Sequence, residues 1–141
     1  MGGAIMSWAH RILTGHFDEE VPQSLELAGL SIGEALQAHT AWIHRFDEAL
    51  KDKSGKGLDP EDVSHDDRCL LGKWIHADHT HDHFNNSPEF RNLKETHAVF
   101  HRNASLVISA LRQGDQQEAR VLLDMVKAKS RQIRVSLAKL C

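Results

Sequence analysis

The stretch SPEFRNLKETHAVFHRNASLVISALR, residues 87–112, decides the fold of this 141-residue chain. It opens as helices do: Ser87 supplies a capping hydroxyl, Pro88 suits the first turn, and Glu89 lies near the positive end of the helix dipole. Apolar side chains and two histidines then share one helical face, formed by Phe90, Leu93, His97, Phe100, His101, Ala104, Ile108 and Leu111. The stretch therefore predicts a long helix that buries this face in a core.

Similar patterns predict long helices on both sides of this one. Gly114 ends the central helix, and Asp115 with Glu118 caps a last helix that runs to the C-terminus. Upstream, Ser31 and Glu34 match the capping box, in which each side chain bonds the backbone N–H of the other residue. The helix that follows carries one mostly apolar face, formed by Ile32, Ala35, Leu36, His39, Ile43, Phe46 and Leu50.

Shorter segments lie between and before the long helices. Residues 4–15 predict a short amphipathic helix, and we expect its Trp8 to dock on the bundle of the same chain rather than on a partner. Another short helix contains Cys69. Loops are expected at residues 51–62, which are rich in glycine, proline and charge, and at residues 76–86, which are polar and irregular.

These elements predict an all-α fold, an antiparallel four-helix bundle with one short helix carrying the cysteine, plus a short N-terminal helix. Residues 1–28 are expected to form the N-terminal extension and residues 29–141 the bundle domain. The sequence contains no internal repeat or low-complexity linker that would separate a second domain.

Composition narrows the class of protein. The net charge of −3 gives no basic surface for nucleic acid, and no apolar run approaches the roughly 20 residues that cross a bilayer. The N-terminus lacks the charged and apolar regions of a signal peptide. Cys69 and Cys141 do not make a disulfide scaffold, and Cys141 is expected to be exposed at the chain end. We therefore expect a reduced, cytoplasmic protein without nucleic-acid binding or membrane insertion.

Three of the 11 histidines, His39, His97 and His101, lie on the apolar stripes of the predicted helices. A lone histidine there is usually a core residue with a hydrogen-bonded ring, but three on converging faces are costly to bury unless each finds a partner. His97 and His101 are one helical turn apart, so both rings can reach a single ion. With the thiolate of Cys69 they form a tetrahedral set that suits Zn²⁺.

Three motifs carry a family resemblance: HTAWIHRF at residues 39–46, CLLGKW at residues 69–74 and HAVFH at residues 97–101. Together they resemble the chemoreceptor zinc-binding domain of bacteria, over about residues 29–140. The resemblance implies a helical bundle that binds zinc through one cysteine and three histidines, which match Cys69, His39, His97 and His101 here. It also implies a cytoplasmic zinc or oxidant sensor, often a dimer, usually attached to a chemoreceptor or a diguanylate cyclase.

The chain departs from the usual family pattern in two ways. About 30 residues remain outside the match, too few for a cyclase or chemoreceptor signalling domain, so the chain either acts in trans or is a piece of a longer protein. The second departure is the histidine-rich run at residues 76–83. It could gather metal or sense pH, although a solvated loop is the preferred interpretation. His44 and His65 lie off the stripes and are expected at the surface.

Catalysis is not expected, because four protein ligands would leave no open position on zinc for water or substrate. The HAVFH turn also lacks the glutamate that serves as general base in H-E-x-x-H metalloproteases. Two other classes stay open: a structural zinc protein, in which the ion only stabilises the fold, and a hemerythrin-like di-iron oxygen carrier. Within the sensor class, the signal could be zinc occupancy or oxidation of Cys69.

Overall fold

The computed structural model describes residues 2–16, 21, 24–53, 55 and 57–141, with only the backbone of residues 2–6. The all-α class is confirmed, since seven helices account for the described fold apart from two strands of two residues each. The elements are α1 (Gly2–Leu13), β1 (Glu26–Leu27), β2 (Leu30–Ser31), α2 (Ile32–Asp52), α3 (Pro60–Ser64), α4 (Leu70–Ile75), α5 (Asp78–His83), α6 (Pro88–Arg112) and α7 (Gln116–Leu140).

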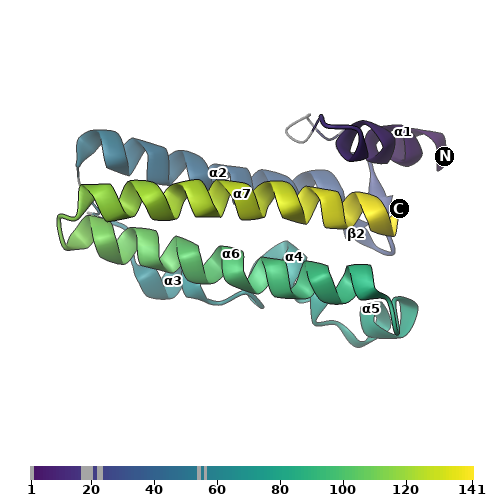
Figure 1. Cartoon of the computed structure of the whole chain (residues 1–141). Coiled ribbons are helices and arrows are strands. Elements are labelled where there is room, and N and C mark those ends of the chain that lie inside the picture. The colour runs from purple at the N-terminus through teal and green to yellow at the C-terminus, as the bar shows by residue number, and fades with distance from the viewer. Residues whose placement is uncertain (1, 17–20, 22–23, 54, 56) are drawn as a thin grey trace.

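Three long helices, α2, α6 and α7, run side by side and enclose the core (Figure 1). The helix starts expected for α6 and α7 are present: Ser87 accepts a hydrogen bond from the Phe90 N–H, and Asp115 accepts one from the Glu118 N–H. The α6–α7 turn contains Gly114 at φ 76°, a conformation that favours glycine. The two longest helices are thus defined by local capping.

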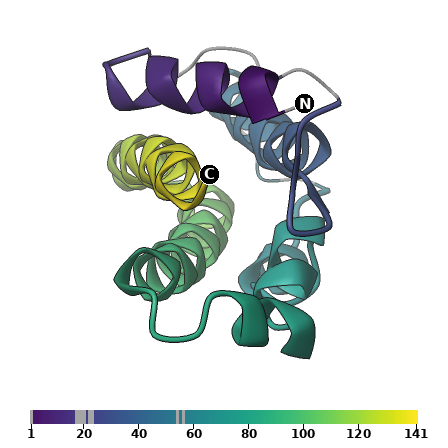
Figure 2. The same ribbon diagram turned by 90° about the vertical axis from the view of Figure 1, so that its right-hand side faces the viewer.

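The remaining side of the bundle is formed by the short helices α3, α4 and α5 rather than by one short helix (Figures 1 and 2). The predictions of loops at residues 51–62 and 76–86 are therefore wrong in part. Residues 60–64 are helical because Asp59 caps the first turn by accepting from the Glu61 N–H. Residues 78–83 are helical as well, although their buried face consists of Thr80 alone, so the polar run shows no amphipathic pattern.

The start of α2 differs from the capping box expected there. Ser31 is the N-cap residue, but its side chain makes no capping hydrogen bond. Instead, the backbone of Ser31 pairs with that of Glu26 in the short antiparallel hairpin of β1 and β2. Ala28 (φ 48°) and Gly29 (φ 87°) form the turn, and two positive φ angles are typical of a two-residue hairpin loop. The hairpin therefore replaces the side-chain cap in directing the chain into α2.

Helix α1 crosses one end of the bundle, over α2 and α7 (Figure 2). Its Trp8 and Ile12 are fully buried and belong to the same hydrophobic core as the long helices. The prediction that Trp8 docks on its own chain is therefore confirmed. Among the described residues, no helix combines the length and apolarity that a membrane span requires.

Candidate metal centre

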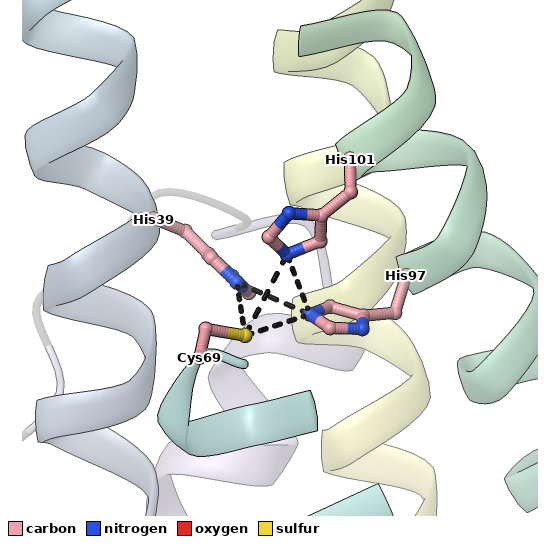
Figure 3. Close-up of side chains that lie close together, drawn as sticks. All are labelled: His39, Cys69, His97 and His101. Atoms are coloured by element: carbon pink, nitrogen blue, oxygen red, sulfur yellow. Dashed lines mark hydrogen bonds between the residues drawn. The ribbon is translucent and has the colours of Figure 1, made fainter. Parts of the chain in front are cut away.

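Three separate segments bring the four predicted side chains to one point inside the bundle (Figure 3). His39 comes from the middle of α2, while His97 and His101 come from successive turns of α6. Cys69 was expected within a short helix, but it is the N-cap residue that precedes α4. The three histidines are 1%, 0% and 3% exposed, whereas Cys69 is partly exposed.

Five of the six distances between the four donor atoms are close to the edges of a tetrahedron around a small cation, and the sixth, between His39 and His101, is at most 4.8 Å. Cys69 Sγ lies 3.6 Å, 3.3 Å and 3.5 Å from Nε2 of His39, His97 and His101. His97 Nε2 lies 3.2 Å from His39 Nε2 and 3.1 Å from His101 Nε2. Zinc bond lengths imply tetrahedral edges of about 3.3 Å between nitrogens and about 3.6 Å from sulfur to nitrogen. The site could therefore hold a metal ion of this size.

The hydrogen bonds of the histidine rings favour the same conclusion. His101 Nδ1 lies 2.8 Å from the Val63 carbonyl oxygen, which can only accept, so Nδ1 carries the proton and Nε2 directs a lone pair at the cluster. Nδ1 of His39 and of His97 has no hydrogen-bond partner among the described residues. A cation at the cluster would satisfy the Nε2 atoms of all three rings but not these two Nδ1 atoms, so the hydrogen-bond evidence for a metal comes from His101.

Burial also keeps the imidazoles in the neutral form that binds metals. It lowers the pKa of His39 to about 3 and that of His97 to about 2, and in both cases neighbouring histidines add to the shift. The pKa of His101 is lowered by burial, against the opposing effects of the Val63 carbonyl and Asp66. Burial raises the pKa of the Cys69 thiol, so a cation at the cluster would be needed to hold it as thiolate.

The CLLGKW motif positions Cys69 through the backbone of α4. The Gly72 N–H donates to Cys69 Sγ at 3.3 Å, which directs the sulfur towards the histidines. The glycine of this motif allows a close backbone approach, which is made by the loop that precedes α4. The Asp66 carbonyl group occupies the space where a Cβ of residue 72 would lie. Glycine is therefore required for segment 66–69 to fold against α4.

Replacing Gly72 by alanine is expected to lower the free energy of unfolding by about 1–3 kcal/mol, because backbone atoms must move to admit the new methyl group. The same movement shifts Cys69, so metal affinity should fall as well. Urea denaturation and a metal titration measure the two effects. Lys73→Ala, at the exposed next position of α4, is the control and should change neither quantity. A stable Gly72→Ala variant with unchanged affinity would contradict this account.

Trp74 ties α4 to the hairpin that precedes α2. Its Nε1–H donates to the Ala28 carbonyl at 2.9 Å, and its ring meets those of Phe84 and Phe90 edge-on. The indole thus holds the backbone of the β1–β2 turn. The helix that carries Cys69 is anchored at its C-terminal end by this contact.

Trp74→Phe is expected to destabilise the protein by about 1–2 kcal/mol, since it leaves the Ala28 carbonyl without its donor while keeping an aromatic ring. Thermal or urea unfolding monitored by circular dichroism measures the loss. Phe84→Leu removes a ring from the same cluster without touching this hydrogen bond and serves as the comparison. If backbone amide exchange at residues 26–31 stays as slow in Trp74→Phe as in the wild type, the indole does not hold the hairpin.

The other histidines do not join the cluster. The only group of metal-ligating side chains found among the described residues is the one formed by His39, Cys69, His97 and His101. The side chains at 76, 79, 81 and 83 are exposed, as is His44, and the side chain of His65 is 34% exposed and lies 2.8 Å from Glu61. Cys141 is partly buried rather than exposed, which raises its pKa to about 11.

Fold and site define a class of protein: an all-helical bundle with an internal Cys–His₃ centre able to hold a metal ion. Residues 39–108 match the family model described as the chemoreceptor zinc-binding domain. This segment belongs to that family, which confirms the resemblance carried by the three motifs, and it contains all four clustered residues. Comparisons with curated proteins and with solved structures found no match.

Proposed function

We propose that this protein binds one Zn²⁺ through His39, Cys69, His97 and His101 and acts as a cytoplasmic regulatory module of bacterial signal transduction. The observation that carries the proposal is the convergence of one sulfur and three nitrogens at tetrahedral spacing inside the core. One thiolate with three imidazoles favours zinc, whereas magnesium, calcium and manganese prefer carboxylates and water.

A regulatory role is more compatible with this donor set than catalysis. Four protein donors fill a tetrahedral coordination sphere, whereas a catalytic zinc ion keeps one position for water or substrate. The three histidines are almost completely buried, which leaves little room for a substrate beside them. We therefore propose a function that depends on holding or releasing the metal, and no enzymatic activity.

The four ligands differ in how firmly the fold holds them. The histidines belong to α2 and α6, which have 21 and 25 residues, whereas Cys69 precedes the six-residue helix α4. If the bond to Cys69 is lost, α4 is the element that can move while the long helices keep their packing. Trp74 would pass such a movement to the β1–β2 hairpin through its bond to Ala28. We propose this route as the start of the output signal.

Two events could break the bond to Cys69. In the first, the free zinc concentration falls and the ion dissociates. In the second, hydrogen peroxide transfers one oxygen atom to the thiolate Sγ, which gives sulfenate and water and weakens sulfur as a ligand. The family name points to chemoreceptor-type signalling. We propose a homodimer whose output reaches a chemoreceptor or a diguanylate cyclase.

Metal analysis of the purified protein by mass spectrometry tests the proposal. We expect one zinc per chain and no iron, a result that would also dismiss a di-iron oxygen carrier. Hydrogen exchange before and after peroxide treatment then tests the oxidative signal, for which protection at α4 should fall. Zinc-free wild-type protein that cannot be loaded with added Zn²⁺ would refute the proposed function.

A further inference from the structure

The four clustered residues differ in how much solvent reaches them. The imidazoles of His39, His97 and His101 are at most 3% exposed, and the partly exposed ligand is Cys69. The shortest way from solvent to the cluster is therefore past the segment that carries Cys69. Partly exposed polar side chains beside Cys69 are placed to act on an ion that takes this way.

Asp66 and His76 are the side chains in this position. Asp66 precedes Cys69 by three residues, and His76 is the C-cap residue of the α4 helix that Cys69 starts. Asp66 Oδ2 lies 3.7 Å from His76 Nε2, and the two side chains are 29% and 35% exposed. The pair therefore faces water, with a carboxylate and an imidazole close to one another.

The same two side chains lie close to the buried ligands. Asp66 is close enough to raise the pKa of Cys69 and of His101, and His76 is close enough to lower the pKa of His97, in each case as a lesser cause than burial. A hollow of about 310 Å³ reaches Asp66 along α6, and its wall includes Ala98 and Arg102, the residues that follow His97 and His101. The position of Asp66 is itself constrained, because its carbonyl packs against Gly72.

We propose that Asp66 and His76 form an outer, transient zinc site through which the ion is loaded into and released from the buried cluster. The inference rests on the proposed function. Carboxylate oxygen and imidazole nitrogen are both zinc ligands, and small side-chain movements bring the pair to the separation that a shared ion requires. Two protein ligands bind zinc weakly compared with four, which is the property that a transfer site needs. Asp66 and His76 then hold the ion while Cys69 forms or breaks its bond.

Rates of metal exchange test the proposal with the double variant Asp66→Asn/His76→Gln. Release of Zn²⁺ is followed by absorbance of a chromophoric chelator and extrapolated to zero chelator, and loading is followed with Co²⁺ through the thiolate-to-cobalt band in a stopped-flow instrument. We expect both rates to fall about tenfold, as for loss of a charged capture site. The dissociation constant should change less, because a transfer site affects both directions.

Asp82→Asn/His83→Gln, on the exposed face of α5, is the matched control, since it makes the same two substitutions away from the cluster. It should exchange metal at the wild-type rate. Wild-type rates in Asp66→Asn/His76→Gln would overturn the transfer site. So would faster release with unchanged loading, because it would show that the pair only stabilises the bound ion. A wild-type protein that binds no zinc would instead refute the proposed function itself.

Discussion

Cys69→Ala and His97→Ala are each expected to bind zinc roughly 100- to 1000-fold more weakly than the wild-type protein. Structural zinc sites with four ligands bind with about 10–16 kcal/mol, so one ligand accounts for about 2.5–4 kcal/mol. His97 should be among the most sensitive positions, because its Nε2 lies 3.1–3.3 Å from the donor atoms of all three other residues. Competition with a chelator of known affinity measures the loss.

His44→Ala is the matched control, because this exposed histidine lies on α2 as His39 does but points away from the cluster. It should bind zinc as tightly as the wild type. His97→Ala also removes buried volume, so Cys69→Ser, which changes volume little, separates loss of a ligand from loss of folding. Unchanged zinc affinity in folded Cys69→Ser and His97→Ala variants would show that the metal binds elsewhere.

Removal of zinc is expected to lower the melting temperature by about 10–20 °C while the far-ultraviolet circular dichroism of the helices is retained. At a free zinc concentration of 1000 times the dissociation constant, binding adds about 4 kcal/mol of stability. In a chain of this size each kcal/mol corresponds to roughly 3–5 °C. The helices should persist because, among the described residues, 30 apolar side chains besides the four proposed ligands are buried in the core.

Thermal scans of chelator-treated and zinc-loaded protein give the melting temperatures, and hydrogen exchange locates the change. Protection should fall in α4 and in the segment just before it, where Cys69 is the one proposed metal ligand, and much less in α6 and α7. Reloading with zinc should restore both quantities. A metal-free chain that is unfolded at room temperature would favour the structural role, in which zinc only stabilises the fold.

Local sequence patterns predicted the long helices and their starts. Ser87 and Asp115 cap helices as expected, because capping involves residues only three positions apart. The short elements were harder to predict. Helix α5 buries Thr80 alone, and the β1–β2 hairpin depends on Ala28 at positive φ, so neither leaves an apolar period in the sequence. Their stability comes from contacts with the rest of the bundle.

The sequence by itself determined where the long helices form and which four side chains belong together as a candidate site. Histidines on buried stripes, the one-turn spacing of His97 and His101, and the flanking motifs are all local signals. Only the tertiary structure decided that donor atoms 28 to 58 residues apart meet at tetrahedral distances. It also revealed the Val63 carbonyl behind His101 and the packing of Asp66 on Gly72. Those contacts are made by backbone groups, which every residue possesses, and so no side-chain pattern in the sequence predicts them.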